Sequence, residues 1–373
     1  MTVIHWKTGF EIELLAPLGA SRKDLAMDLA KRANGGSVAP VFVPQAELIS
    51  LEGVQVFENL TLGYDAFDAR GALIARCADD MTIQTDLDRS APAKPGWYRI
   101  VGDDPRILRL VMRHSDPTAS LHDVLLPSAR IFGVELRHFD NGMVRLADRF
   151  DAPIAMATQL PGERERPCEI ITPPISENHH ERLSALLDPA HEMGFTIPVE
   201  AALHVHFDAA PLCTAGSFAK LVLIFDRFGD QLKGLFNTNP HCARLGKWPG
   251  ELPSLVEEPS FLASSWEDAR SRLKALKLTK YVDFNVMNMI YPLSEKHTFE
   301  VRILPVEFDV ASILKSTALL EGLLRLATAP GVSLSDIRAG TLDNLIAGME
   351  IEPAARNYWL ARSATGHSGA SDR

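Results

Sequence analysis

Stretches in which apolar and polar residues alternate recur along the chain, and this two-residue period predicts β-strands with one face in water. Between them, apolar residues recur at helical spacing, bounded by capping residues or by glycine. Strands are expected at about 9–15, 168–175, 200–208, 280–289 and 297–304, with shorter β-like pieces between Gly, Pro and Asp throughout 38–165. Helices are expected at about 22–31, 177–193, 215–236, 265–276, 309–328 and 334–349.

Particular residues mark several of these boundaries. Ser21 can cap the first helix, and Ser264 with Glu267 predicts a capping box for the helix that ends near Leu276. The pieces LRLVMRH and ARIFGVELRHF, inside 38–165, are interpreted as strands, and PGERERP as a polar turn. PHCARLGKWPGELP is interpreted as a loop, YPLSEK as a turn, and the tail HSGASDR as disordered.

This order of elements predicts an α+β protein in which the strands are mainly antiparallel. Strands and helices do not alternate regularly as in βαβ units, and no glycine-rich phosphate loop is present. The Rossmann and P-loop classes therefore have no support in the sequence.

Composition and charge exclude several other classes. The 373-residue chain is 46 % hydrophobic and 23 % charged, which is ordinary for a globular protein. Its net charge of −10 argues against nucleic-acid binding, because phosphates require a basic face. The four scattered cysteines show neither zinc-knuckle spacing nor a disulfide framework, so reduced thiols are expected. We find no signal-peptide pattern and no apolar run of membrane length, and expect a cytoplasmic protein with no membrane partner.

Three of the predicted strands carry an unusual set of polar groups on one face: two carboxylates, two imidazoles, and a carboxylate beside a guanidinium. The side chains are Glu11 and Glu13, His204 and His206, and Glu300 and Arg302. Alternate residues of a strand lie about 6.5–7 Å apart. That spacing suits two neighbouring metal sites, or a metal ligand beside a substrate ligand. Carboxylates and imidazole bind divalent cations, and Arg binds phosphoryl oxygens through a bidentate fork.

Each pattern by itself has a plain structural explanation: a solvated strand face, structural or exposed histidines, or a surface ion pair. Their joint occurrence on strands that are otherwise strongly apolar favours a metal–phosphate site. Further candidates are Glu169 in CEIITPPI as a metal ligand, Lys280 and Tyr281 as a cation and a stacking ring, and Arg244 as a mobile phosphate or carboxylate contact. An ordinary strand entrance and a solvated loop arginine remain the alternatives for the last three.

Five motifs follow one another along the chain: GFEIE at 9–13, CEIITPP at 168–174, LHVHFD at 203–208, KYVDFN at 280–285 and TFEVRIL at 298–304. This ordered set resembles the amidoligase family, part of the carboxylate–amine ligase superfamily that includes glutamine synthetase and glutamate–cysteine ligase. The resemblance spans about residues 9–328. It implies a curved, mainly antiparallel β-sheet of the glutamine synthetase/glutamate–cysteine ligase type, with helices packed on its convex side. The concave face of such a sheet binds ATP with Mg²⁺ or Mn²⁺.

The resemblance also implies roles for individual residues. The implied metal ligands are Glu11, Glu13, Glu169, His206 and Glu300. The implied catalytic residues are Glu300 and Arg302, with Arg302 contacting the transferred phosphoryl group. The residues themselves add His204 as a further catalytic candidate, and Lys280, Tyr281 and Arg244 beside Arg302 as candidate nucleotide contacts. The general base is not identified; His204 and Asp208 are the candidates, and Asp80 in ADDMTIQTD is a weaker candidate for an acidic ligand.

The same resemblance predicts the domain organisation. Residues 1–330 are expected to form the catalytic domain, and 331–373 a C-terminal helical extension with a disordered tail. The interval before CEIITPP is longer than a compact member of the family needs, which predicts an inserted β-rich segment at about 45–165.

The expected activity is ATP-dependent joining of a carboxylate to an amine through an acyl phosphate. The expected partners are small-molecule or peptide carboxylates and amines. The sequence does not determine the oligomeric state and leaves a homo-oligomer open, since related ligases often assemble. One alternative is a metal-dependent hydrolase that uses the His204–His206 pair and a carboxylate. Its additional histidines are hard to find, since His114, His138 and His241 have no comparable strand setting. A non-catalytic binding protein on the same scaffold is the other alternative. Tightly bound zinc would favour the hydrolase, and ligand binding without ADP release would favour the binding protein.

Overall fold

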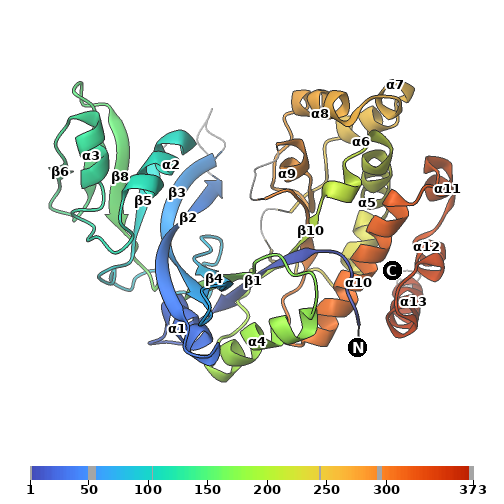
Figure 1. Ribbon diagram of the computed structural model, residues 1–373, viewed down its shortest axis with the longest axis horizontal. Helices are drawn as coiled ribbons and strands as arrows, with labels where there is room; N and C mark the ends of the chain where they lie inside the picture. The colour runs from blue at the N-terminus through green and yellow to red at the C-terminus, as the bar shows by residue number, and fades with distance from the viewer. Residues whose placement is uncertain (1, 49–55, 103, 243–244, 292–295, 369–373) are drawn as a thin grey trace. The chain divides into compact units, whose positions relative to one another are not determined.

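Antiparallel strands and helices make up the chain, as the sequence predicts. The computed structural model describes residues 2–48, 56–102, 104–242, 245–291 and 296–368, and its fold class is α+β (Figure 1). The chain divides into two compact units. Unit 1 comprises Met1–Ile12, Pro174–Ser184 and Ala201–Arg373, and unit 2 comprises Glu13–Pro173 and Ala185–Glu200. The domain boundaries expected above, and the glutamine synthetase-like form of the sheet, stay predictions.

Strand β1 (Thr8–Leu15) begins in unit 1 and ends in unit 2. Within unit 1 the strand order is β11-β12-β10-β1, and every pair is antiparallel. The other three strands of this unit are β10 (Leu203–Asp208), β11 (Phe284–Asn285) and β12 (Thr298–Leu304). One face of these four strands is strongly apolar, and the other carries the charged and amide side chains.

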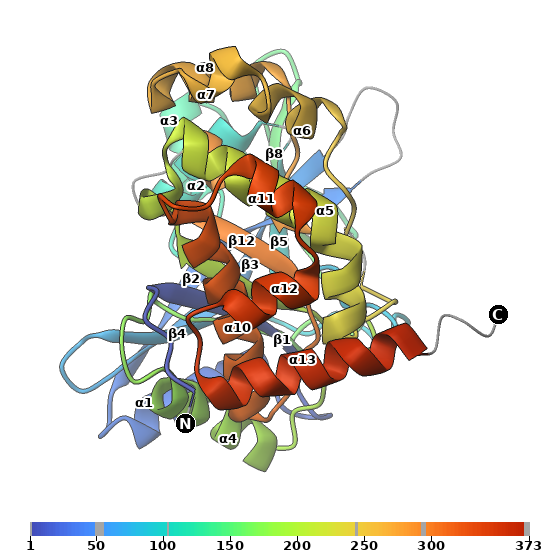
Figure 2. The ribbon, with the colours of Figure 1, turned by 90° about the vertical axis from the view of Figure 1, so that its right-hand side faces the viewer.

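Two long helices of unit 1, α5 (Ala215–Phe236) and α10 (Val310–Thr328), pack together, and α5 contacts β12. The ring of Phe225 in α5 lies 4.6 Å from the ring of Phe284 and 5.1 Å from that of Phe299, so the apolar face of the strands is buried against α5. Helix α13 packs on α10 and α5 (Figure 2). The remaining helices of this unit are α6 (Glu251–Val256), α7 (Pro259–Leu262), α8 (Trp266–Ala275), α9 (Met287–Ile290), α11 (Leu334–Ala339), α12 (Leu342–Gly348), α13 (Pro353–Ser368) and the 3₁₀ turn η1 (Ala210–Leu212).

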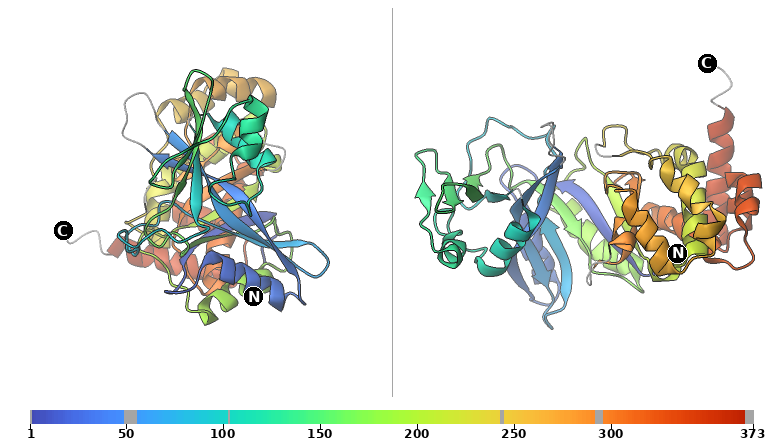
Figure 3. Two further views of the ribbon diagram at one scale, coloured as in Figure 1. Left: turned by 90° about the vertical axis from the view of Figure 1, so that its left-hand side faces the viewer. Right: turned by 90° about the horizontal axis from the view of Figure 1, so that it is seen from above.

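Unit 2 is built around a long central strand, β3, which pairs with β2 on one edge and with both β4 and β5 on the other. The strand order continues as β9-β4-β3-β5-β8-β7-β6. Helix α2 packs on β3 and β5 and contacts α3 (Figure 3). The strands are β2 (Ser37–Leu48), β3 (Val56–Phe67), β4 (Leu73–Ala78), β5 (Tyr98–Gly102), β6 (Arg137–His138), β7 (Val144–Ala147), β8 (Pro153–Gln159) and β9 (Pro167–Ile171); the helices are α1 (Arg22–Arg32), α2 (Pro105–His114) and α3 (Leu126–Phe132), while α4 (His179–Glu192) passes from unit 1 into unit 2.

Several predicted helices are confirmed almost to the residue. Ser21 caps α1 in a capping box with Asp24. Helix α4 ends just before Gly194, whose positive φ of 81° suits glycine at the end of a helix. Helices α5 and α10 also lie where the apolar spacing predicts them, with Thr214 and Asp309 as their N-caps.

Two pieces that were interpreted as strands are helical. LRLVMRH lies in α2, where Asp104 is the N-cap and Pro105 fills the first turn. ARIFGVELRHF contributes to α3, which ends at Gly133 with a φ of 65°, before the two-residue strand β6. Each helix has a proline in its first turn, and this helix-start signal outweighs the β-like composition of the two segments.

The C-terminal half of the chain requires further corrections. The predicted strand at 280–289 is only two residues long, because Asn285 Oδ1 accepts the Met287 backbone N–H at 2.9 Å and the chain turns into α9. The cap of α8 is Ser265, bonded to Asp268, rather than Ser264 with Glu267. Gly340 divides the predicted helix at 334–349 into α11 and α12.

Helix α13, which extends to Ser368, was not predicted. The rest of the tail expected to be disordered, 369–373, and most of YPLSEK, 292–295, lie outside the described residues. In the described part of the chain, no helix is both long enough and apolar enough to cross a membrane.

Candidate functional site

Strand register brings together three donor groups that are far apart in the sequence. Within unit 1, His204 lies opposite Glu11, and His206 lies opposite Glu300. Glu11, His206 and Glu300 each offer one ligand atom, and these atoms lie within 4.8 Å of one another. We call these three residues the unit 1 cluster. Three convergent donors of this kind have the chemistry of a divalent-cation site.

The imidazole of His206 is oriented by a hydroxyl on the neighbouring strand. Its Nδ1 lies 3.3 Å from Thr298 Oγ1, which also accepts a hydrogen bond from Asn288 Nδ2 at 3.3 Å. Its buried Nε2 has no hydrogen-bond partner among the described residues, and lies 3.0 Å from Glu11 Oε1 and 4.0 Å from Glu300 Oε1. The contact of Nδ1 with Thr298 orients the ring so that Nε2, the nitrogen that would bind an ion, faces the two carboxylates.

The carboxylate of Glu300 is fixed from two sides. Asn285 Nδ2 donates to Oε2 at 2.7 Å, and Arg302 Nη1 donates to Oε1 at 2.7 Å. Burial alone would raise the pKa of Glu300, but the charges of His206 and Arg302 outweigh it and lower the pKa to about 2. Glu300 is therefore an anion at neutral pH.

Glu11 is also held as an anion. Lys296 Nζ lies 2.9 Å from Oε1, and His204 Nδ1 lies 3.2 Å from Oε2. Burial opposes ionisation of Glu11, but His206, Lys296 and His204 together hold its pKa well below the ordinary value. Burial and the charge of Arg302 lower the pKa of His204, against the pull of Glu11 and Glu300. A neutral imidazole beside two carboxylates is the protonation state that metal binding requires.

A second set of donors lies within unit 2. Glu13 in β1, Asp80 after β4 and Glu169 in β9 place one carboxylate oxygen each within 4.8 Å of the others. We call these three residues the unit 2 cluster. Glu13 and Asp80 are buried, and Asp80 Oδ1 accepts hydrogen bonds from the Thr82 backbone N–H at 2.7 Å and from its hydroxyl at 2.8 Å.

The five predicted metal ligands are thus divided between the two clusters. Glu11, His206 and Glu300 meet in unit 1, and Glu13 and Glu169 meet in unit 2, where Asp80 joins them. Asp80 was only a weak candidate, because ADDMTIQTD does not align clearly with the short acidic turn of the family. The roles of all six residues stay predictions.

The other predicted residues have different settings. Arg302 contacts Glu300 directly, and its backbone N–H donates to the Asp283 carbonyl at 3.0 Å. Lys280 and Tyr281 lie in the loop before β11, with the Lys280 Nζ 5.5 Å from the Tyr281 ring centroid. Asp208 Oδ1 accepts the Ala210 backbone N–H at 3.0 Å, so this carboxylate caps a turn at the end of β10.

Arg244, the predicted mobile contact, lies outside the described residues. Four residues around the unit 1 cluster were missed by the sequence reasoning: Lys296, Thr298, Asn285 and Asn288. Lys296 and Thr298 could have been found, because they share the even-numbered period of Glu300 and Arg302 in the HTFEVRIL region. The two asparagines carried no such signal, because the predicted strand around them ends early.

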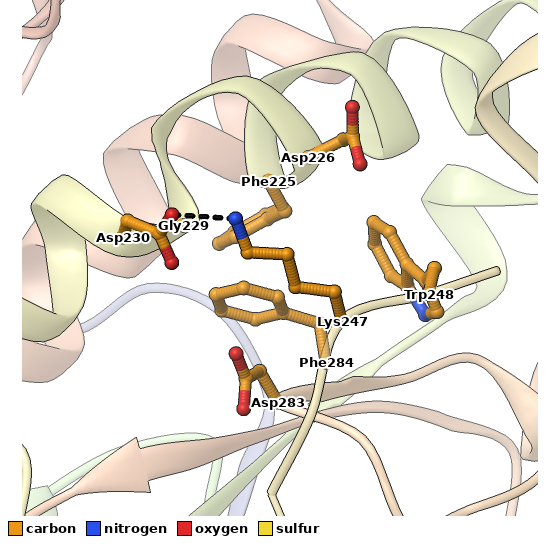
Figure 4. A pocket seen from close by; sticks show the side chains of 8 residues that line it. All are labelled: Phe225, Asp226, Gly229, Asp230, Lys247, Trp248, Asp283 and Phe284. Atoms are coloured by element: carbon orange, nitrogen blue, oxygen red, sulfur yellow. Dashed lines mark hydrogen bonds and ion pairs between the residues drawn. The ribbon is translucent and has the colours of Figure 1, made fainter. Parts of the chain in front are cut away.

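A small pocket beside α5 is a different feature (Figure 4). Lys247 crosses it and binds Asp230 Oδ2 at 2.5 Å, while Asp283 on the far side binds Lys233 Nζ at 2.8 Å. The cavity volume of about 10 Å³ is close to the minimum that holds a single water molecule. This pocket therefore serves packing and ion pairing rather than substrate binding.

The chain belongs to the family described as "Putative amidoligase enzyme", whose model matches residues 5–323. The match includes both clusters and confirms the resemblance predicted from the five motifs. It indicates an enzyme of the ligase type. A search among curated proteins finds no significant match.

Proposed function

We propose that the protein is an ATP-dependent ligase that joins a carboxylate to an amine through an acyl phosphate. Family membership supports the ligase class. The observation that carries the finer assignment is the unit 1 cluster, in which the buried Nε2 of His206 faces the carboxylates of Glu11 and Glu300 with Arg302 beside them. Donors for a divalent cation next to a guanidinium are what a bound triphosphate requires.

Mg²⁺ or Mn²⁺ suits these donors better than zinc does, because most of them are hard carboxylate oxygens. Glu11, His206 and Glu300 would hold one ion, and Glu13, Asp80 and Glu169 would hold another. Such ions neutralise and align phosphate oxygens when they are bound. Thr298 and Asn285 would keep His206 and Glu300 in orientation for this role.

The first chemical step is attack of the substrate carboxylate oxygen on the γ-phosphorus of ATP, with ADP as the leaving group. Charge on the transferring group requires positive side chains rather than covalent help. Arg302 is the best-placed side chain, because its contact with Glu300 holds the guanidinium at the cluster.

In the second step, the amine nitrogen attacks the acyl carbon and inorganic phosphate leaves. The attacking ammonium must first lose a proton. His204 is the candidate base, because burial keeps its imidazole neutral and able to accept one. Asp208 is a weaker candidate, since its carboxylate already accepts a backbone hydrogen bond.

The test is an assay of ADP release with Mg²⁺ or Mn²⁺ across a panel of acids and amines. We expect release that requires both an acid and an amine, and a decrease of at least about 100-fold in Glu300→Gln and Arg302→Met. Glu267→Gln, on helix α8, is the matched control and should retain full activity. ATP binding without ADP release for any acid–amine pair would contradict the proposal, as would tight binding of zinc in preference to Mg²⁺ or Mn²⁺.

A further inference from the structure

A buried arginine in unit 2 wraps the turn that carries Asp80. Arg164 is 4 % exposed, although it lies in PGERERP, which the sequence predicts to be a polar surface turn. Its Nη1 donates to the Ile83 carbonyl at 2.6 Å, and its Nη2 donates to the Asp80 carbonyl at 2.7 Å and to a carboxylate oxygen of Asp79. One guanidinium thus binds three successive parts of the turn after β4.

A second buried arginine holds Arg164 in its place. Arg22 is fully buried, donates from Nη1 to the Arg164 carbonyl and from Nε to the Leu62 carbonyl at 2.8 Å, and lies 4.4 Å over the ring of Trp97. Its Nη2 lies 3.6 Å from Asp79 Oδ2. The turn is therefore tied to α1 and β3 through charged groups that are out of contact with water.

This arrangement determines where the Asp80 carboxylate lies. Arg164 fixes the backbone of Asp80 through its carbonyl, and Thr82 fixes the side chain through two hydrogen bonds to Oδ1. Mutual repulsion of Glu13, Asp80 and Glu169 would otherwise drive the turn away from the other two carboxylates. A buried scaffold that resists this movement keeps the three donors convergent before an ion arrives.

We propose that Arg164 is a positioning residue for a divalent-cation site formed by Glu13, Asp80 and Glu169. Its guanidinium contacts the turn rather than the ion. This inference rests on the proposed function, because it assumes that the unit 2 cluster binds an ion. It goes further by assigning the site's geometry to an arginine and to the Asp79–Arg22 pair behind it.

Electrostatics alone predicts the opposite effect of removing this arginine. Deleting a buried positive charge near three carboxylates should strengthen cation binding, because it removes a repulsion. Deleting a positioning group should weaken binding, since loss of the partners that orient ligands costs about 10- to 100-fold in metal affinity. The sign of the change therefore distinguishes the two roles.

The experiment measures Mn²⁺ binding to the full-length protein by equilibrium dialysis and electron paramagnetic resonance. Glu13→Gln and Glu11→Gln assign the signals of the unit 2 and unit 1 clusters. We expect Arg164→Met to weaken Mn²⁺ binding about 10- to 100-fold at the unit 2 cluster and to leave the unit 1 cluster unchanged. Arg164→Lys retains the charge but not the fork, and is expected to weaken the same site; it decides the question if Arg164→Met does not fold.

Arg166→Met is the matched control. This arginine lies two residues away and binds Glu163 and the Ala16 carbonyl rather than the turn at 79–83, so the control should keep both sites. Equal or tighter Mn²⁺ binding in the Arg164 variants would overturn the inference and leave the proposed function standing. If the wild type shows no Mn²⁺ signal that Glu13→Gln removes, the unit 2 metal site itself is refuted.

Discussion

The hydrogen bond between His206 Nδ1 and Thr298 Oγ1 connects a residue of β10 with one of β12. This bond orients the ring so that Nε2, and not Nδ1, faces Glu11 and Glu300. A hydroxyl that is not itself a metal ligand therefore controls which nitrogen of His206 can bind an ion. Threonine is common in strands for reasons of packing alone. Here the hydroxyl of Thr298 also orients the imidazole ring of His206.

Replacing this hydroxyl should weaken metal binding without unfolding the protein. We expect Thr298→Val to reduce Mn²⁺ affinity at the unit 1 cluster about 10-fold, because the ring loses the partner that fixes its tautomer. Thr298→Ser keeps the hydroxyl and should bind Mn²⁺ like the wild type. Titration calorimetry on both variants is the measurement, and equal affinity in Thr298→Val would show that the hydroxyl has no orienting role.

The charge state of Glu300 predicts how the metal-free protein responds to acid. A carboxyl whose pKa falls from its ordinary value of 4.5 to about 2 on folding stabilises the native state above pH 4.5, and this contribution is lost as the pH falls toward 2. In EDTA-treated protein, the free energy of unfolding should therefore fall more steeply below pH 4.5 in the wild type than in Glu300→Gln. The difference in slope is at most about 1.4 kcal/mol per pH unit.

Denaturant titrations at pH 5 and at pH 4 measure this difference. Glu267→Gln is the control and should follow the wild type. Parallel pH dependence in the wild type and Glu300→Gln would mean that folding leaves the ionisation of Glu300 unchanged.

Which side chains share a strand face could be predicted from the sequence, because the two-residue period fixes it. That period placed Glu300 with Arg302 and His204 with His206. Which residues meet across strands depends on register, and register between distant segments leaves no local trace. The approach of Lys296 to Glu11, and of Asn285 to Glu300, belongs to this second kind of information.

At the scale of whole elements, helices with a clear cap and a long apolar stripe were predicted accurately, as α5 and α10 illustrate. Short elements were predicted less accurately, because a few apolar residues fit both the two-residue period of a strand and the 3.6-residue period of a helix. Helix α2 is the informative error: its Arg-rich, apolar sequence resembles a strand, but Asp104 and Pro105 begin a helix. Asp104 and Pro105 both predict the start of a helix, but the β-like composition of LRLVMRH led to its interpretation as a strand.

Helix α2 should therefore depend on its cap. Asp104 accepts the Arg106 backbone N–H at 2.8 Å, and the contact with Arg106 lowers the pKa of Asp104 to about 2, so the cap is charged at neutral pH. We expect Asp104→Ala to lower the urea midpoint of unfolding, because the helix loses its N-cap acceptor. Asp104→Asn, which retains a cap acceptor, should lose less in the same urea titration. An unchanged midpoint in Asp104→Ala would contradict a stabilising cap.

For the whole molecule, the main finding is that each unit contains its own set of donors. The sequence predicted five of the six residues as metal ligands, but not the unit boundary between Glu11 and Glu13, because the position of unit boundaries depends on contacts that no local pattern records. The boundary falls inside β1, between Ile12 and Glu13. Ordinary indicators of a domain boundary, such as a polar linker, are missing there.

With one set of donors in each unit, two Mn²⁺ sites are expected. Wild-type protein should bind two Mn²⁺ ions, and Glu11→Gln and Glu13→Gln should each remove one of them. Both variants keep side-chain volume and lose one negative charge, which makes each the control for the other. A single site abolished by either substitution would show that the clusters act as one centre.

Glu11 and Glu13 are separated only by Ile12, and this has a practical consequence for dissecting the protein. No truncation, fusion point or circular permutation can deliver unit 1 and unit 2 as independent fragments without ending in the middle of β1. A chimera that exchanges unit 2 for that of a relative must include a splice at this residue, besides those after Pro173, Ser184 and Glu200, and must preserve the alternation on either side. Deleting Ile12 would turn the following glutamate to the opposite face, so the spacing of these three residues matters to the donor sets of both units at once.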